Sequence, residues 1–124
     1  MVNKLIEILK NMEKKHGKVL MFALLKMDEL TNKWSIVISA PWITAENRKE
    51  IFLELIKATN QSLTPEESIT IARIGLFPQE EHIVQELLQY KEGMHIEEKV
   101  QINGNIIHEA YILASNSNQQ KQGK

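Results

Sequence analysis

Apolar residues in the first 17 positions recur every three or four residues, which is the period of a helix with one buried face. Charged and polar residues fill most positions between them, so the pattern predicts an amphipathic helix of about four turns. Lys14, Lys15 and His16 place positive charge at the negative end of this helix. Gly17 can adopt the left-handed conformation that often follows a last helical turn. The predicted buried face consists of Val2, Leu5, Ile6, Leu9 and Met12.

The segment Val19–Leu25 is apolar at every position and is shorter than most buried helices. This pattern is typical of a strand that is covered on both faces, so we predict a central strand here. A period of two follows from Trp34 to Ala40, and the polar residues 28–33 between the segments indicate an antiparallel hairpin. Helices can cover one face of the first strand. Either another helix of the same chain or the same surface of a second copy must cover the other. We expect a homodimer, with Leu20, Phe22 and Leu24 in its interface.

The middle of the chain carries helix signals. Thr44 is a suitable N-cap for a helix over residues 45–59. The tetrapeptide Thr64-Pro65-Glu66-Glu67 combines a capping box with proline at the first helical position, and it predicts one or two helical turns. Residues 69–77 are rich in isoleucine and predict a strand, and a third helix is indicated around Ile83–Leu88.

The last folded segment is predicted to be a β-hairpin. Residues 94–102 and 106–114 flank Asn103-Gly104, which supplies the positive φ angles of a type I′ turn. The predicted order is therefore αββαβαββ. It favours an α+β fold with a mostly antiparallel or mixed five-stranded sheet and three helices packed on it. We expect residues 1–114 to form one domain. The polar tail, residues 115–124, is expected to be disordered because it has no apolar side chain to offset the entropy of ordering.

The composition excludes several kinds of site. None of the 124 residues is cysteine, so disulfides, cysteine-ligated zinc and thiol nucleophiles are excluded. The 15 Lys and Arg residues balance the 16 Asp and Glu residues, and a net charge of −1 makes nucleic-acid binding unlikely. Phosphate-binding glycine motifs do not occur, and we expect no cofactor and no metal. With no signal-peptide pattern and no apolar run of about 20 residues, we expect a cytoplasmic protein without a membrane partner.

The corner between the second strand and the next helix is a candidate binding site. In Ile38-Ser39-Ala40-Pro41-Trp42 and the following Thr44, hydroxyl groups, an aromatic ring and helix N–H groups could meet an anionic or planar ligand. The same residues also have a structural explanation, in which the proline ends the strand, Trp42 packs in the core and Thr44 caps the helix. We prefer that interpretation. The segment resembles parts of small bacterial proteins of unknown function. The resemblance covers about a third of the chain and implies no activity. We include Trp42 among the candidate interaction residues.

Two acidic residues of the terminal hairpin form a second candidate site. If Asn103-Gly104 makes a two-residue turn, Glu98 faces Glu109, with Tyr111 nearby. Facing carboxylates can raise one pKa, as acid–base chemistry requires. A three-residue loop would instead pair Lys99 with Glu109 and remove the cluster. We prefer structural charges, because one turn fixes the register weakly and exposed carboxylates turn toward water.

A weaker signal is the pair His82 and Glu86, which share a helix face but lack the further residues of a zinc motif. Electrostatics at the helix start explain the acidic residues there. The sequence therefore favours a non-enzymatic protein-interaction domain that self-associates. A small enzyme or ligand-binding protein with an acidic pocket near the terminal hairpin is the alternative.

Overall fold

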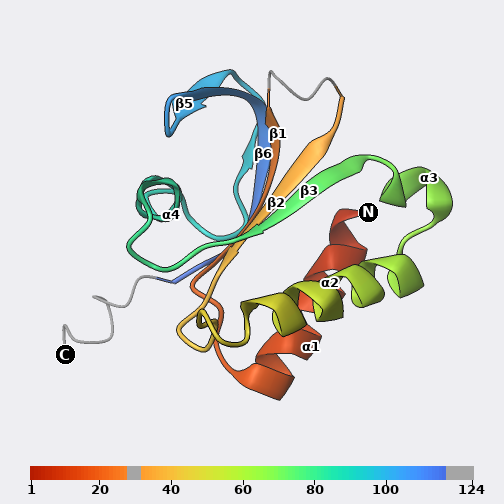
Figure 1. Ribbon diagram of the computed structural model, residues 1–124. Coiled ribbons are helices and arrows are strands. Elements are labelled where there is room, and N and C mark those ends of the chain that lie inside the picture. The colour runs from red at the N-terminus through yellow and green to blue at the C-terminus, as the bar shows by residue number, and fades with distance from the viewer. Residues whose placement is uncertain (28–31, 117–124) are drawn as a thin grey trace.

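Figure 1 shows the computed structural model of the chain, which describes residues 1–27 and 32–116. Its helices are α1 (Val2–His16), α2 (Arg48–Ser62), α3 (Pro65–Ser68) and α4 (His82–Leu87). Its strands are β1 (Met21–Met27), β2 (Trp34–Ser39), β3 (Ile71–Leu76), β4 (His95–Ile96), β5 (Val100–Ile102) and β6 (Asn105–Ser115). The predicted α+β class with a mixed sheet is confirmed.

The sheet is built around β1. Its strands lie in the order β3-β2-β1-β6-β4, and β5 also pairs with β6. Both neighbours of β1 run antiparallel to it, which confirms the predicted central strand and its hairpin with β2. β3 is parallel to β2, because α2 and α3 carry the chain back across one face of the sheet between them. This crossover leaves β3 at an edge of the sheet, where β2 is its only strand neighbour within the described chain.

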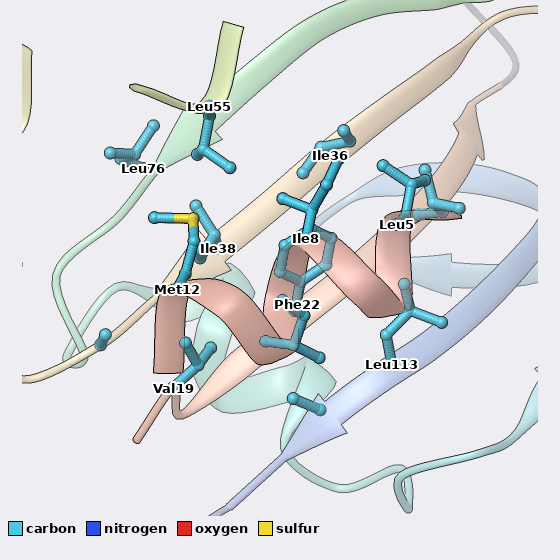
Figure 2. Close-up of a cluster of buried hydrophobic side chains, with 14 of the residues drawn as sticks. Leu5, Ile8, Met12, Val19, Phe22, Ile36, Ile38, Leu55, Leu76 and Leu113 are labelled. Carbon is cyan, nitrogen blue, oxygen red and sulfur yellow. The ribbon is translucent and has the colours of Figure 1, made fainter. Parts of the chain in front are cut away.

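Each face of β1 belongs to a separate hydrophobic core. Phe22 and Leu24 point toward α1 and α2, and Figure 2 shows Phe22 below Ile8 of α1. Met21 and Leu25 point to the opposite face, which α4 and the terminal hairpin cover. A strand that is apolar on both faces is thus covered on both faces by its own chain. The side chains that α4 adds to this second core are Ile83, Val84 and Leu87.

The expectation that Leu20, Phe22 and Leu24 contact a second copy is therefore corrected. All three side chains are 0% exposed within a single chain. The sequence shows that this strand needs cover, but it does not show that α4 and the terminal hairpin fold back to supply it. These residues stabilise the fold and are not available to a partner.

Two short elements give the described chain more strands and more helices than the sequence predicts. The strand predicted over residues 94–102 is interrupted and becomes β4 and β5, so the described sheet has six strands instead of five. The capped turn after Thr64 is the separate helix α3, which gives the described chain four helices instead of three. The capping box itself is confirmed, because Thr64 accepts the backbone N–H of Glu67 and Glu67 accepts that of Thr64.

The helix after the corner begins later than predicted. α2 starts at Arg48 and not at Ala45. The Thr44 N–H donates to Oδ1 of Asn47 at 2.8 Å, and the Asn47 N–H donates to Oγ1 of Thr44 at 3.3 Å. These reciprocal bonds close a turn ahead of the helix, and the turn uses the hydroxyl that was predicted to cap it.

β6 continues past the predicted end of the domain. Ser115 belongs to β6, and the Asn116 N–H donates to the Leu20 carbonyl at 2.7 Å. The first two residues of the predicted disordered tail are thus ordered, because they extend the ladder beside β1. Residues 117–124 of that tail, and residues 28–31 of the predicted polar loop, lie outside the described residues. Within the described chain, no helix combines the length and the apolar character needed to cross a membrane.

Candidate functional site

The predicted acidic cluster forms only in part. Glu109 and Tyr111 lie on β6 and share the sheet face that α1 packs against. Glu98 does not join them. It is exposed and lies between β4 and β5. The predicted register holds next to the turn, where Val100 pairs with Ile107, but His95 pairs with Tyr111 where the same register would require Ile96. The one-residue shift between the two short strands explains why Glu98 and Glu109 do not face each other.

His95 takes the place that was predicted for the second carboxylate. Its Nε2 atom lies 2.6 Å from Oε2 of Glu109, and its ring stacks on Tyr111 with centroids 4.0 Å apart. Lys26 lies with Nζ 3.7 Å from Oε1 of Glu109 and 4.7 Å from the Trp34 ring centre. Burial raises the pKa of Tyr111 above its ordinary value of 10.0, and the negative charge of Glu109 raises it further. Glu109 thus contacts Lys26 of β1 and His95 of β4, which is typical of a cluster that ties β4 and β1 to β6.

Trp42, the remaining candidate interaction residue, has a structural environment. Its indole N–H lies 3.0 Å from the carbonyl oxygens of both Gly17 and Lys18. Its ring stacks on His16 with centroids 4.6 Å apart, and Nε2 of His16 lies 3.0 Å from Oε1 of Glu54 on α2. Trp42 therefore lies within hydrogen-bonding distance of two carbonyl groups just after α1, and it packs on His16, which in turn contacts α2.

The histidine–glutamate pair also has a structural partner. His82 and Glu86 form an ion pair on α4, and Oε1 of Glu86 accepts the N–H of Asn103 at 2.9 Å. This bond connects α4 to the turn between β5 and β6. In the part of the chain that the structure describes, no three histidine, cysteine, aspartate or glutamate side chains converge as metal ligands.

A groove that could bind another molecule lies between α2 and the outer edge of β3, and we call it the α2–β3 groove. Its wider part has a volume of about 400 Å³ and lies at the start of α2. Its narrower part, of about 170 Å³, reaches the end of the same helix. Both parts are lined by Phe52 and Ile74, so they adjoin at these two side chains. Its larger apolar side chains are Phe52, Ile56, Ile71, Ile74 and Leu76.

One wall of the α2–β3 groove is the outer backbone edge of β3, which has no strand beside it in the part of the chain that the structure describes. In a parallel ladder, alternate residues turn their N–H and C=O groups toward the neighbouring strand. The Phe77 N–H donates to the Ile38 carbonyl at 3.0 Å, so this alternation directs the backbone groups of Ile74 and Leu76 away from β2. An extended segment laid beside β3 would find hydrogen-bonding groups at its edge and apolar side chains from α2 beside them.

The charge of the α2–β3 groove has one sign at its wider end. Among the described residues that line this end, the charged side chains are Arg48 and Lys49, both exposed and both on the first turn of α2. The sequence contains the residues of the groove but not their juxtaposition. An isoleucine-rich strand and a phenylalanine on a predicted helix are the signals it offers, and they indicate a groove only when β3 is known to be an edge strand.

Comparison of the chain with protein-family models, with curated proteins and with solved structures finds no match.

Proposed function

We propose that this protein is a protein-interaction domain that binds an extended segment of another protein in the α2–β3 groove. The observation that carries the proposal is the position of an apolar groove along the edge of β3 that no other strand of the described chain covers. The added segment would extend the sheet through backbone hydrogen bonds and would place alternate side chains against Phe52 and Ile74.

The charge at the wide end of the α2–β3 groove indicates which kind of segment binds there. The two cations at the wide end favour a segment that carries carboxylates. A second copy that pairs through the same edge would contribute Ile71–Leu76, which contains Arg73 and no acidic residue. Such pairing would bring no carboxylate to the two cations, so a foreign segment with apolar and acidic side chains fits better than self-association. The buried strand β1 no longer provides a reason for a homodimer.

Selection from a random dodecapeptide library displayed on phage tests this function. We expect enriched peptides to alternate apolar with polar residues and to contain aspartate or glutamate. In NMR titrations, a selected peptide should shift the amide signals of β3 and of the first half of α2. Reversing both groove cations, Arg48→Glu with Lys49→Glu, should weaken binding about tenfold, because like charges then meet at the rim. The matched control, Lys10→Glu with Lys14→Glu on the exposed face of α1, should bind as the wild type does.

Three results would overturn the proposal. The library could yield no enriched peptide, the enriched peptides could shift signals of β4 and β6 instead of β3, or both double variants could bind equally well. Light scattering of the free protein tests the other possible occupant of the groove, which is a second copy of the chain. A dimer whose formation shifts the β3 amide signals would assign the edge to a second copy.

A further inference from the structure

The backbone edge that β3 presents to the α2–β3 groove is interrupted near its start. The pairing of β3 with β2 shifts by one residue between Ile71 and Arg73, which leaves Ala72 as an extra residue in β3. Such a bulge disturbs the alternation of backbone groups along a strand. From Arg73 to Leu76 the pairing with β2 is regular. A segment laid beside β3 therefore finds a regular edge only along this second part of the strand.

A proline ends the same edge on the other side. After Leu76, the next residue that the alternation directs away from β2 is Pro78. Proline has no backbone N–H, and the Pro78 carbonyl accepts the Glu81 N–H at 3.1 Å. The groups that the regular edge offers are therefore the N–H and the C=O of Ile74 and of Leu76. A segment of about five residues uses all of them.

Positive charge lies at one end of this short edge. α2 and β3 run in opposite directions, so the first turn of α2 lies beside the end of β3 (Figure 1). Arg48 and Lys49 of that turn line the groove together with Leu76. Glu50 is the acidic residue of the same turn, and it is not part of the lining. The cations therefore lie where the ladder beside β3 would end.

The narrower end of the groove has a different character. Neutral polar side chains line it, and they are Thr59, Asn60 and Ser68. Arg73 also reaches this end, but its Nε atom donates to Oγ of Ser35 at 3.2 Å on the opposite face of the sheet. The two ends of the groove thus distinguish the two directions in which a segment could lie.

The end of a polypeptide chain matches the groove in one direction. In a segment parallel to β3, the last residue can donate its N–H to the Leu76 carbonyl. The terminal carboxylate then lies just past the ladder, beside Arg48 and Lys49. An antiparallel segment would bring its N-terminal side to the same place, and a free amino group would be repelled there.

We infer that the α2–β3 groove binds the C-terminal end of a partner protein as a short strand parallel to β3, with the free carboxylate beside Arg48 and Lys49. This inference rests on the proposed function and specifies its ligand. A terminal carboxylate is part of the backbone, so pairing with β3 positions it without ordering another side chain. The residues opposite Leu76 and Ile74 are then the second and fourth from the C-terminus, and their side chains face Phe52. We expect apolar residues at these two positions.

Synthetic peptides test the carboxylate and the register separately. The probe acetyl-SGSTVTVS has valine second and fourth from a free carboxyl end, and in NMR titrations it should shift the amide signals of Ile74 and Leu76. Its C-terminal amide should bind about tenfold more weakly, because it lacks the charge. Acetyl-SGSVTVTS has the same composition with valine third and fifth. It should also bind more weakly, because its valines turn away from Phe52.

A pair of double variants tests which cations recognise the carboxylate. Arg48→Gln with Lys49→Gln should weaken binding of the free acid about tenfold, to the affinity of the amide, and should leave the affinity of the amide unchanged. The matched control, Lys10→Gln with Lys14→Gln on the exposed face of α1, should bind both peptides as the wild type does.

A spin label at the N-terminus of the probe tests its direction. A parallel strand begins at the narrower end, so the label should broaden the signals of Asn60 and Ser68 and not that of Ala45. The inference is wrong if the amide binds as tightly as the acid, if the label broadens Ala45 instead, or if the two double variants behave alike. Where β3 signals still shift in these cases, the groove binds extended segments and only the recognition of a chain end fails. If none of the peptides shifts β3 signals, the inference fails together with the proposed function.

Discussion

Glu67 shows how one side chain can join segments that are far apart in the sequence. Its carboxylate closes the capping box of α3 by accepting the Thr64 N–H at 2.9 Å, and it accepts a hydrogen bond from Nζ of Lys4 at 2.8 Å. The capping box is a local pattern, so the sequence predicts it. The bond to Lys4 spans 63 positions and depends on how α1 and α3 pack, so no local pattern indicates it. Glu67 therefore stabilises both a helix start and a tertiary contact.

This arrangement predicts a stability change at acid pH. The hydrogen bond from Lys4 is the main cause that lowers the pKa of Glu67 from 4.5 to about 2, and the bond from Thr64 lowers it further. A lowered folded-state pKa contributes stability that is fully present above the unfolded pKa and is lost as the pH falls through the folded one. We expect the unfolding free energy, measured by urea denaturation, to decrease from about pH 5 to pH 2. Glu67→Gln should flatten this decrease, and Glu66→Gln, whose side chain takes no part in these bonds, should not. Equal pH profiles for the two variants would contradict the assignment.

At the scale of elements, the segment that leaves α1 is held by Trp42, which follows β1 and β2 in the sequence. The carbonyl groups of Gly17 and Lys18 directly follow α1, and the Trp42 indole N–H lies within hydrogen-bonding distance of both. Trp42→Phe removes the donor but keeps an aromatic ring that can stack on His16. We expect it to lower the unfolding free energy by about 1 kcal/mol in urea denaturation. Trp42→Ala also removes the ring and should cost more. The assigned role would be wrong if Trp42→Phe were as stable as the wild type.

Element types follow from the sequence more closely than element boundaries and pairing do. The period of α1, the apolar run of β1 and the Asn103-Gly104 turn each lie within one segment, and each prediction is confirmed. The start of α2 was misplaced because Thr44 has two competing uses, as a cap and as part of a turn with Asn47. The pairing of Glu98 with Glu109 was wrong because the turn fixes the register only near itself, and the ladder shifts by one residue before β4.

At the scale of the whole molecule, the order of strands determines which surfaces are available. The sequence shows that β1 is covered on both faces, but it does not distinguish a second copy from α4 and the terminal hairpin as the cover. It also gives no sign that the crossover through α2 and α3 leaves β3 at an edge. The α2–β3 groove lies against β3, so it could not be predicted before this position was known.

A pair of leucine substitutions tests this assignment of core and surface. Leu24 is 0% exposed between the sheet and α1, so Leu24→Glu places a carboxylate in an apolar core and should cost more than about 4 kcal/mol. Leu53 on α2 is 54% exposed, and Leu53→Glu should change the unfolding free energy by less than about 0.5 kcal/mol. Circular dichroism melts measure the stability of each variant, and light scattering measures its state of association. If β1 were an interface between copies, Leu24→Glu would instead yield a folded monomer, because the carboxylate would then be exposed to water. A variant that loses its structure, beside a Leu53→Glu protein that melts like the wild type, places β1 in the interior of a single chain.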